Sequence, residues 1–414
     1  MPCTRRICAL LAVLAALTAA PAQGAVQSAQ SPRSALKGAL RRAMEQASPA
    51  SGAYVVDAGT GATIFGWRSG TKRILASNTK LFTTATALAR QGPGAQLETR
   101  VLARGSRSGT TWLGDLYLRG TGDPALGSAA YNQARYAGGT SVEALAQEIS
   151  ALGLSRIEGA VVGDESRWDS LRGTAYSAFG GSGDIGGPLT ALAYNHARGA
   201  NGRFQINPPV YAAARFADAL RKAGVTVAES ARRGTAPDDA VELAGAESLP
   251  MSRLSQITGI RSENWFAEML LKGLPGAGTT RDGAAEARRY ARSLGSSASI
   301  VDGSGLSRSN RAAPREVVDL LVGLRGEPAF DSFYASLPTA GLNGTLVDRM
   351  RSGAAHGRCH AKTGTIVGVT TLSGYCDSRS GRTFAFSILM NSSGTTAGRR
   401  IQDRMAQALA GYRG

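Results

Sequence analysis

The hydrophobic and polar positions at the start of this chain follow first a helical and then a strand-like spacing. In SPRSALKGALRRAMEQA (31–47), apolar residues recur every three or four positions, which predicts a helix. GAYVVDAGTGATIFGWRS (52–69) instead predicts two strands joined by a Gly-rich turn. Helical spacing returns in SNTKLFTTATALARQGPG (77–94) and ends at its Gly-Pro-Gly.

The pattern changes after about residue 98. TRVLARGSRSGTTWLGDLYLRGTGDPAL (99–126) is rich in strands and turns. SVEALAQEISALGLSRIEGAVVGD (141–164) and PPVYAAARFADALRKAGVTV (208–227) each predict a helix followed by a strand. Between them, GTAYSAFGGSGDIGG (173–187) has the composition of a flexible segment.

Longer helices and antiparallel-type strands return in the last part of the chain. ENWFAEMLLKGL (263–274) predicts a helix, RTFAFSILMN (382–391) a strand and GRRIQDRMAQALAGY (398–412) a closing helix. Helices near both ends, each with strands beside it, favour one domain that is split by an insertion. The chain is long enough for this arrangement.

The predicted fold class is therefore α+β. The boundaries that the pattern favours are 26–97 and 241–414 for the split domain and 98–240 for an inserted α+β accessory domain.

Residues 1–25 have the order of a secretory signal peptide. Two arginines are followed by an apolar run at 7–17 and by small residues at 20–22, and cleavage after Ala22 or Gly24 fits the small-residue rule. The run is too short to span a bilayer, and no later apolar stretch reaches that length. We expect an exported protein of the periplasm without stable membrane insertion.

Removal of this leader leaves two cysteines, Cys359 and Cys376. They flank HAKTGTIVGVTTLSGY (360–375), which predicts two strands joined by a turn at Gly368. In an oxidising compartment a disulfide across the ends of this hairpin is expected, and closing the loop adds about 3 kcal/mol in the entropic model. The alternative is a pair of unpaired buried cysteines.

The formal net charge of +17 raises the question of nucleic-acid binding. The excess is spread as single or paired arginines, without a basic tail or an aromatic-studded groove, so we expect no nucleic-acid partner. Anionic polymers of the cell envelope fit this charge better. With 41 arginines and only six lysines, lysine is expected where an amine must lose its proton, because arginine stays charged.

A serine precedes a lysine by three positions at three places, and only one pair stands where chemistry is expected. Ser77 lies at the entrance of a predicted helix with Lys80 one turn later on the same face, and a helix N-terminus favours negative charge. The other two pairs lie on a surface helix and in a turn. They are Ser34 with Lys37 and Ser69 with Lys72.

Serine becomes a nucleophile only when a base takes its proton. The chain has three histidines and no G-x-S-x-G elbow, which weakens a Ser-His-Asp hydrolase. A lysine serves as base when burial or a nearby cation lowers its pKa. We expect Lys362, in the only K-T-G of the chain, to supply that cation. It would lie on an edge strand, where the small Gly364 leaves room for a ligand backbone. The only S-x-N, Ser262 to Asn264, supplies a hydroxyl and an amide.

This ordered trio resembles the active-site serine penicillin-recognising enzymes, with their S-x-x-K, S-D-N and K-T-G motifs. More narrowly, the chain is similar to the D-alanyl-D-alanine carboxypeptidase/endopeptidase family that includes penicillin-binding protein 4. The segments that carry this similarity are GDLYLRGTGDPAL (114–126), GPLTALAYN (187–195), VDGSGLSRSN (301–310), LPTAGLNGTLVDRM (337–350) and AKTGTIVGVTTLSGY (361–375).

The resemblance implies a penicillin-recognising serine transferase/hydrolase fold, in which an antiparallel sheet flanked by helices joins an all-helical subdomain. It implies a serine DD-peptidase that acts on peptidoglycan stem peptides and is acylated by β-lactams, with no metal or organic cofactor. Ser77 would attack the penultimate D-alanine carbonyl with Lys80 as base. Ser262 and Asn264 would complete the proton network and hold the substrate amide.

The resemblance also implies the substrate-binding residues. Lys362 would supply positive potential, Thr363 and Thr365 would bind the terminal carboxylate, and Arg308 would contact the peptide stem at the rim. The backbone N–H groups of Ser77 and Thr365 would form an oxyanion hole, often worth about 3–4 kcal/mol.

Two departures from the family and two alternatives remain at this point. Leu75 replaces a proline common before the first motif, and the insertion after Asn195 is abbreviated, which affects the accessory domain rather than the active site. A serine β-lactamase would share the trio, but the E-x-x-x-N and Y-x-N patterns of two β-lactamase classes are absent. The other alternative is a non-catalytic envelope protein that binds penicillin or peptidoglycan.

Overall fold

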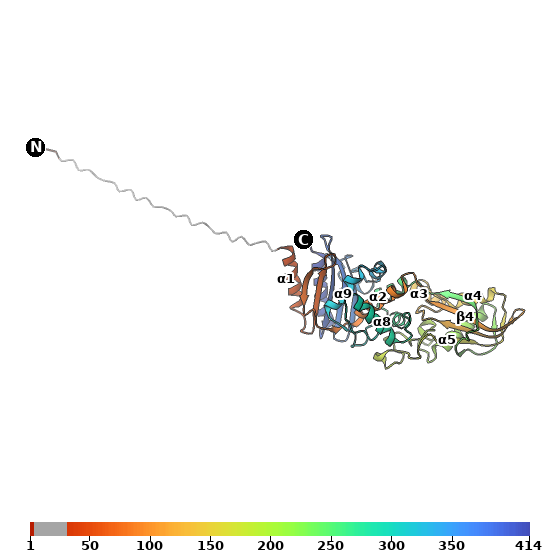
Figure 1. Cartoon of the computed structure of the whole chain (residues 1–414). Helices are drawn as coiled ribbons and strands as arrows, with labels where there is room; N and C mark the ends of the chain where they lie inside the picture. Colours follow the sequence, from red (N-terminus) through yellow and green to blue (C-terminus); the bar gives the residue numbers. More distant parts are fainter. Residues whose placement is uncertain (4–30) are drawn as a thin grey trace.

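The computed structural model describes residues 1–3 and 31–414. The expected signal peptide lies almost entirely outside the described residues. Figure 1 shows an elongated molecule with α1 (Pro32–Met44) and the C-terminus at one end and the insertion at the other. Among the described helices, none is both long and apolar enough to cross a membrane.

The central element is a five-stranded sheet in which all neighbours are antiparallel. Its strands carry many β-branched and aromatic residues, and the middle strands are buried on both faces because helices cover both sides. In spatial order the strands are β12 (Cys359–Ile366), β13 (Val369–Asp377), β14 (Thr383–Asn391), β1 (Gly52–Asp57) and β2 (Thr63–Trp67).

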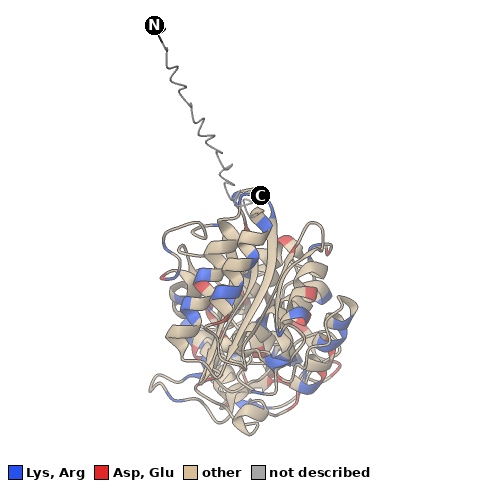
Figure 2. Cartoon of the chain, turned by 90° about the vertical axis from the view of Figure 1, so that its left-hand side faces the viewer, with Lys and Arg blue, Asp and Glu red and all other residues tan. Residues whose placement is uncertain are grey.

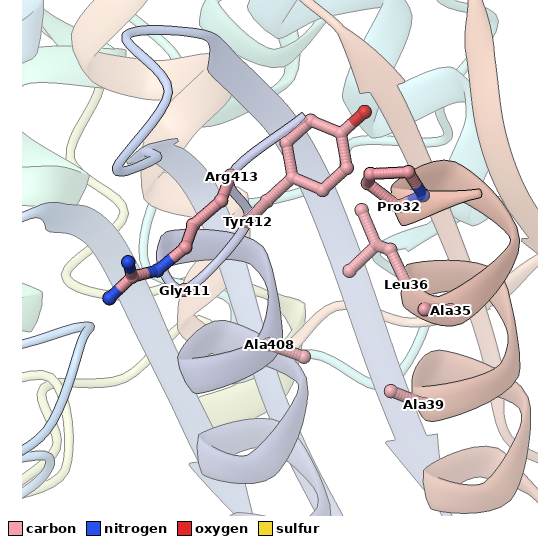
Figure 3. Close-up of a pocket in the computed structure, with 8 residues that line it drawn as sticks. All are labelled: Pro32, Ala35, Leu36, Ala39, Ala408, Gly411, Tyr412 and Arg413. Carbon is pink, nitrogen blue, oxygen red and sulfur yellow. The ribbon is translucent and has the colours of Figure 1, made fainter. Parts of the chain in front are cut away.

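Two hydrophobic cores hold helices against this sheet. On one face α1 packs beside α11 (Thr395–Ala410) over residues such as Phe386. Figure 3 shows Leu36 and Tyr412 across the shallow groove between these two helices, and no residue of the serine and lysine motifs lines it.

The other face is covered by a group of helices that form the larger core around residues such as Phe82 and Trp265. A short ribbon of β3 (Arg73–Ile74) with β11 (Arg311–Ala312) lies beside them. The helices are α2 (Thr79–Gln91), α6 (Met251–Ile260), α7 (Asn264–Lys272), α8 (Thr280–Ser293), α9 (Pro314–Leu324) and α10 (Phe330–Tyr334).

The insertion has its own sheet and its own core. Helices α4 and α5 pack on the sheet around residues such as Leu116 and Phe216, and the short helix α3 lies nearer the larger core. The elements are β4 (Glu98–Ser108), β5 (Thr111–Gly120), α3 (Ala129–Tyr136), α4 (Val142–Ala151), β6 (Arg156–Ile157), β7 (Val161–Asp164), α5 (Pro208–Lys222), β8 (Thr226–Val227), β9 (Arg232–Arg233) and β10 (Val241–Glu247).

The sheet of the insertion extends past the boundary expected at residue 240. Strand β10 pairs antiparallel with β4, from Val241 opposite Ala103 to Glu247 opposite Glu98. The inserted unit therefore reaches Glu247, because its last strand completes the sheet that its first strand begins.

The chain leaves and re-enters the split domain at neighbouring residues. The Ser248 N–H donates to the Leu97 carbonyl at 2.8 Å, and the Leu97 N–H donates to Ser248 Oγ at 2.9 Å. The Gln96 side-chain amide donates to the Ser248 carbonyl at 2.6 Å. These bonds hold the two junctions together.

The structure pairs Cys359 with Cys376 in a disulfide, and the two residues stand directly opposite each other in the β12–β13 register. Basic and acidic residues nearly balance within the insertion, so the positive charge belongs to the rest of the chain. Figure 2, which views the end formed by α1 and the C-terminus, shows Lys and Arg scattered over many elements.

Candidate active site

The first motif lies where the chain enters α2. A short 3₁₀ turn, Ala76–Asn78, carries Ser77 and continues directly into α2, so Lys80 follows one turn later. Ser77 is half-buried, Lys80 is fully buried, and Lys80 Nζ donates to Ser77 Oγ at 3.0 Å. Ala76 has a φ of 47°, a costly left-handed conformation that turns the chain sharply just before the serine.

The Lys80 amine has two further acceptors, Asn264 Oδ1 and the Ser304 carbonyl, each at 2.7 Å. The protonated amine has three N–H groups, and each has an acceptor here. A neutral amine would keep two of these hydrogen bonds and direct its lone pair toward the Ser77 hydroxyl. Burial lowers the pKa of Lys80 to about 8, although the negative charges of Glu268, Asp302 and Glu263 act to raise it. The amine thus loses its proton far more readily than an exposed lysine does.

Glu268 holds the loop that lies against Lys80. One carboxylate oxygen accepts from the Gly303 N–H at 2.9 Å and the other from the Ser304 N–H at 2.8 Å. Because the Ser304 carbonyl accepts from Lys80, Glu268 positions an acceptor of the amine. Glu268 is completely buried, and burial together with the nearby Asp302 raises its pKa to about 7.

Asp302 organises the next turn of the same loop. Its two oxygens accept from the Gly305 and Ser307 N–H groups, each at 2.8 Å, and Asn310 donates to it at 2.7 Å. Sequence reasoning missed Asp302 and Glu268. The available signal was a glutamate inside the otherwise apolar run of the α7 helix, because a buried charge in such a run needs partners.

The second and third motifs meet through a lysine–serine bond. Lys362 Nζ donates to Ser262 Oγ and to the Thr363 carbonyl, each at 2.9 Å. Burial, followed by the charge of Lys80, lowers the pKa of Lys362 well below its ordinary value. Ser262 has a φ of 60°, a second left-handed residue at this site. All three motifs therefore converge around the two buried amines.

The close packing of β12 against Ser77 depends on Gly364. A Cβ added there would lie 2.2 Å from Thr371 Oγ1 and 2.9 Å from the Ser77 amide nitrogen, closer than real Cβ contacts. The Asn78 side-chain amide donates to the Lys362 carbonyl at 2.8 Å and fixes the strand there. Strand β12 is at the edge of the sheet, as expected for a strand that receives a ligand backbone.

The remaining candidate residues lie farther along β12 and at its rim. Thr363 Oγ1 is 2.7 Å from Thr345 Oγ1, and the exposed Thr365 accepts from Arg399 at 3.3 Å. Arg308 donates to the Val367 carbonyl at 3.0 Å, which ties it to the β12–β13 turn.

The segment 173–187 of the insertion also lies at this site. The Asn264 amide group donates to the Asp184 carbonyl at 2.7 Å, and Tyr176 Oη donates to Asp184 Oδ2 at 2.6 Å. A sequence with the composition of a flexible loop thus forms turns that contact the second motif. Nothing in the sequence pointed to this contact, because the acceptor is a backbone carbonyl.

Other potential chemistry does not gather near Ser77. The described hydrogen bonds of Lys72 include the Ser297 carbonyl but not Ser69, and His196 is bonded to Tyr136 in a buried aromatic cluster. Within residues 1–3 and 31–414, no group of three or more His, Cys, Asp or Glu side chains is placed to hold a metal ion.

Comparison with known proteins identifies the family. The model of the D-Ala-D-Ala carboxypeptidase 3 (S13) family matches residues 36–176 and 192–412. The chain belongs to this family. It is 31% identical over 451 residues to the D-alanyl-D-alanine carboxypeptidase of Actinomadura sp. (strain R39), covering 88% of this chain and 82% of that protein. A Mycobacterium tuberculosis carboxypeptidase is 30% identical over 376 residues, covering 86% and 79%.

Solved structures show the same fold for this S13 family member. Penicillin binding protein 4 from Haemophilus influenzae has a TM-score of 0.73 at 20% identity and covers 89% of this chain and 98% of its own. A predatory peptidoglycan endopeptidase from Bdellovibrio bacteriovorus has a TM-score of 0.57 at 17% identity, covering 86% and 92%.

These findings confirm three predictions made from the sequence. They are the penicillin-binding protein 4-like family, the penicillin-recognising fold and the class of serine-type D-Ala-D-Ala carboxypeptidase/endopeptidase acting on peptidoglycan. The stretch that the family model leaves unmatched, 177–191, includes much of the segment that contacts Asn264.

Proposed function

We propose that this chain works in the periplasm, where it trims terminal D-alanine or cuts peptide cross-links through an acyl-enzyme on Ser77. The observation that carries the proposal is the 3.0 Å bond between Ser77 Oγ and a fully buried Lys80 amine whose pKa is about 8. A base of this strength is matched to proton transfer near neutral pH. The periplasmic location rests on the pattern of residues 1–25.

Acylation begins when the neutral Lys80 amine accepts the Ser77 hydroxyl proton while Oγ attacks the penultimate D-alanine carbonyl. The C–N bond then breaks, and the leaving amine of the terminal D-alanine takes a proton. Ser262, bonded to Lys362, is the proposed proton donor, and Lys362 re-supplies it. In the second half of the reaction, water attacks the ester carbonyl and gives a proton to the Ser262–Lys362 pair, while Lys80 returns its proton to Ser77 Oγ as the ester bond breaks and the shortened peptide leaves.

Substrate alignment falls to β12 and α7. The edge strand offers its backbone for pairing with the peptide, Gly364 allows the close contact with Ser77, and Thr363 and Thr365 receive the terminal carboxylate near Lys362. Arg308 lies at the rim for the stem. The Asn264 amide is already bonded to the Asp184 carbonyl, so a substrate carbonyl takes the place of Asp184 when it binds.

Reaction with benzylpenicillin tests the assignment of the nucleophile. A β-lactam complex of the Haemophilus influenzae penicillin binding protein 4 supports the choice of probe. Intact-protein mass spectrometry of the chain after incubation is expected to show one penicillin adduct, absent in Ser77→Ala and retained in the matched control Ser69→Ala. An adduct that persists in Ser77→Ala would mean that another serine is the nucleophile.

Turnover separates the remaining alternatives. Release of D-alanine from a short peptide ending in D-Ala-D-Ala, dependent on Ser77, supports the proposed activity. Rapid, Ser77-dependent hydrolysis of penicillin would instead identify a β-lactamase. If neither adduct nor turnover occurs, the chain is a non-catalytic binding protein.

A further inference from the structure

The side of the insertion next to the candidate active site exposes several large apolar side chains around one hollow. Leu171, Phe179 and Ile206 are 45%, 51% and 90% exposed. Together with Pro188 they line a hollow of about 340 Å³. Apolar side chains gathered at one exposed place mark binding surfaces in soluble proteins.

Two neighbouring hollows share lining residues with this one or with each other. Phe204, Gln205 and Ile206 also line a second hollow of about 450 Å³, and Tyr211 is shared between that hollow and a third of about 320 Å³. We call the three hollows together the accessory groove. The helix α5, labelled in Figure 1, contributes Tyr211 to it. Three hollows linked by shared lining residues favour an extended ligand over a compact one.

The accessory groove begins beside the active-site helix α7. Its first hollow is lined by residues of the segment whose Asp184 carbonyl accepts from Asn264 at 2.7 Å. Its third hollow includes Tyr131, whose ring lies 6.0 Å from that of His196, and His196 stacks on Trp265 at 4.9 Å. The groove therefore lies within two ring contacts of α7, the helix that carries Asn264.

Two stretches of strained backbone border the groove. Ala178 and Phe179 have φ values of 48° and 62°, so a left-handed turn displays the Phe179 ring to solvent. Asn195, His196 and Ala197 have φ values of 49°, 56° and 52°, immediately before Arg198 in the third hollow. Such conformations are costly for residues other than glycine and cluster at ligand sites.

The lining has the chemistry that recognises a sugar chain. Aromatic rings offer apolar faces for the C–H faces of sugar rings, and the Gln205 and Asn201 amides offer donors and acceptors for hydroxyl and acetamido groups. Arg198 stacks on the Phe204 ring at 4.5 Å, which fixes that ring. Arg172, Arg198, Arg203 and Arg215 also line the groove, with no acidic side chain among its lining residues, so the groove accommodates carboxylates carried by the sugar chain as well.

We propose that the accessory groove binds the glycan strand of peptidoglycan, a chain of β-1,4-linked N-acetylated amino sugars, while its stem peptide reaches Ser77. This inference rests on the proposed function, since the peptide and the glycan belong to one polymer. The insertion then favours polymeric substrate, whereas the residues around Ser77 bind only the end of the peptide.

Binding to peptide-free glycan strands tests the groove without catalysis. In the Ser77→Ala protein, strands stripped of peptides by an amidase are expected to bind in isothermal titration at up to millimolar concentration. Phe204→Ala and Ile206→Ser should each weaken this binding about tenfold. The matched control is Leu113→Ser on β5, where a 47% exposed leucine lies outside the groove. Failure of the unaltered groove to bind, or equal binding by all variants, overturns the proposal.

Kinetics separate this inference from the proposed function. With Ser77 present, D-alanine release is compared between intact sacculi and a short peptide ending in D-Ala-D-Ala. We expect Phe204→Ala and Ile206→Ser to lower the sacculus rate relative to the peptide rate about tenfold, and Leu113→Ser to leave the ratio as it was. A parallel fall on both substrates overturns the groove. Absence of all peptide hydrolysis in the unaltered protein refutes the proposed function, while the binding measurement still decides the groove.

Discussion

Replacing Gly364 by alanine places a methyl group between β12 and the nucleophile. The new Cβ would lie 2.2 Å from Thr371 Oγ1, 2.9 Å from the Ser77 amide nitrogen and 3.0 Å from the Leu75 carbonyl oxygen. Ordinary contacts of a Cβ begin at about 3.4 Å. Thr371 cannot rotate away freely because its hydroxyl donates to the Leu75 carbonyl at 3.0 Å. The strand must therefore move away from Ser77.

The shift needed to bring these contacts to 3.4 Å is about 0.4–1.2 Å. A misplacement of about 1 Å costs on the order of 100-fold in rate. It separates the backbone N–H groups of Ser77 and Thr365, which the family resemblance implies as the oxyanion hole, and loss of one such donor costs about 100- to 1,000-fold. We therefore expect Gly364→Ala to slow acylation by benzylpenicillin at least 100-fold. The overpacked strand should also lower the free energy of unfolding by about 1–3 kcal/mol.

The assay is the rate of adduct formation by mass spectrometry at several penicillin concentrations, with thermal melting alongside. Gly70→Ala is the matched control, because a Cβ there meets nothing within 4 Å. The double variant Gly364→Ala/Thr371→Ala should recover only part of the rate, since the contacts with Ser77 and Leu75 persist. Acylation of Gly364→Ala within threefold of the wild-type rate would refute the reasoning.

Three further predictions concern titration and covalent stability. The acylation rate should rise with pH, with a midpoint at about pH 8, as Lys80 loses its proton. Glu268→Gln should move this midpoint to lower pH, because Glu268 is the largest of the charges that raise the Lys80 pKa. Stopped-flow pH profiles check both. Burial lowers the pKa of His196 to about 3. Between about pH 6.5 and pH 3 the unfolded chain therefore binds more protons than the folded one, and the free energy of unfolding decreases as the pH is lowered. Lowering the pH from 7.5 to 5 should reduce the free energy of unfolding by about 2 kcal/mol through this histidine. Urea unfolding of His196→Phe should not show this reduction. Reduction of the bond between Cys359 and Cys376 should lower the free energy of unfolding by up to about 3 kcal/mol, measured by urea unfolding with and without dithiothreitol; a paired Cys359→Ala/Cys376→Ala variant should be insensitive to the reductant.

Local spacing was enough to predict most helices and strands of the catalytic part. The apolar face of α2 and the continuous apolar run of β14 are properties of short segments, and the structure has those elements where the patterns place them. The boundary of the insertion was less accessible. The expected boundary at residue 240 falls short because the partner of residues 241–247, in β4, is far away in the chain, and no local pattern specifies such a pairing.

The same distinction applies to the site. Ser77, Lys80 and Lys362 stand in short motifs at the ends of elements, so their meeting is foreseeable once each motif is placed on its element. Glu268 acts through the backbone N–H groups of Gly303 and Ser304, which any sequence supplies, and the Asp184 carbonyl is likewise a backbone atom. Contacts of side chains with distant backbone leave almost no trace in the sequence.

The bonds between Leu97 and Ser248 have a consequence for how this architecture diversifies. Because the insertion starts and ends at adjacent residues, its outer sheet can lengthen, shorten or be replaced without pulling the catalytic strands apart. The inner end of the insertion cannot vary as freely, because Tyr136 and Leu189 are buried in the same core as Trp265. Evolutionary change is thus expected to accumulate toward the far end of the insertion, while its buried inner end keeps its shape. Relatives with different outer sheets would then keep the same arrangement of residues around Ser77.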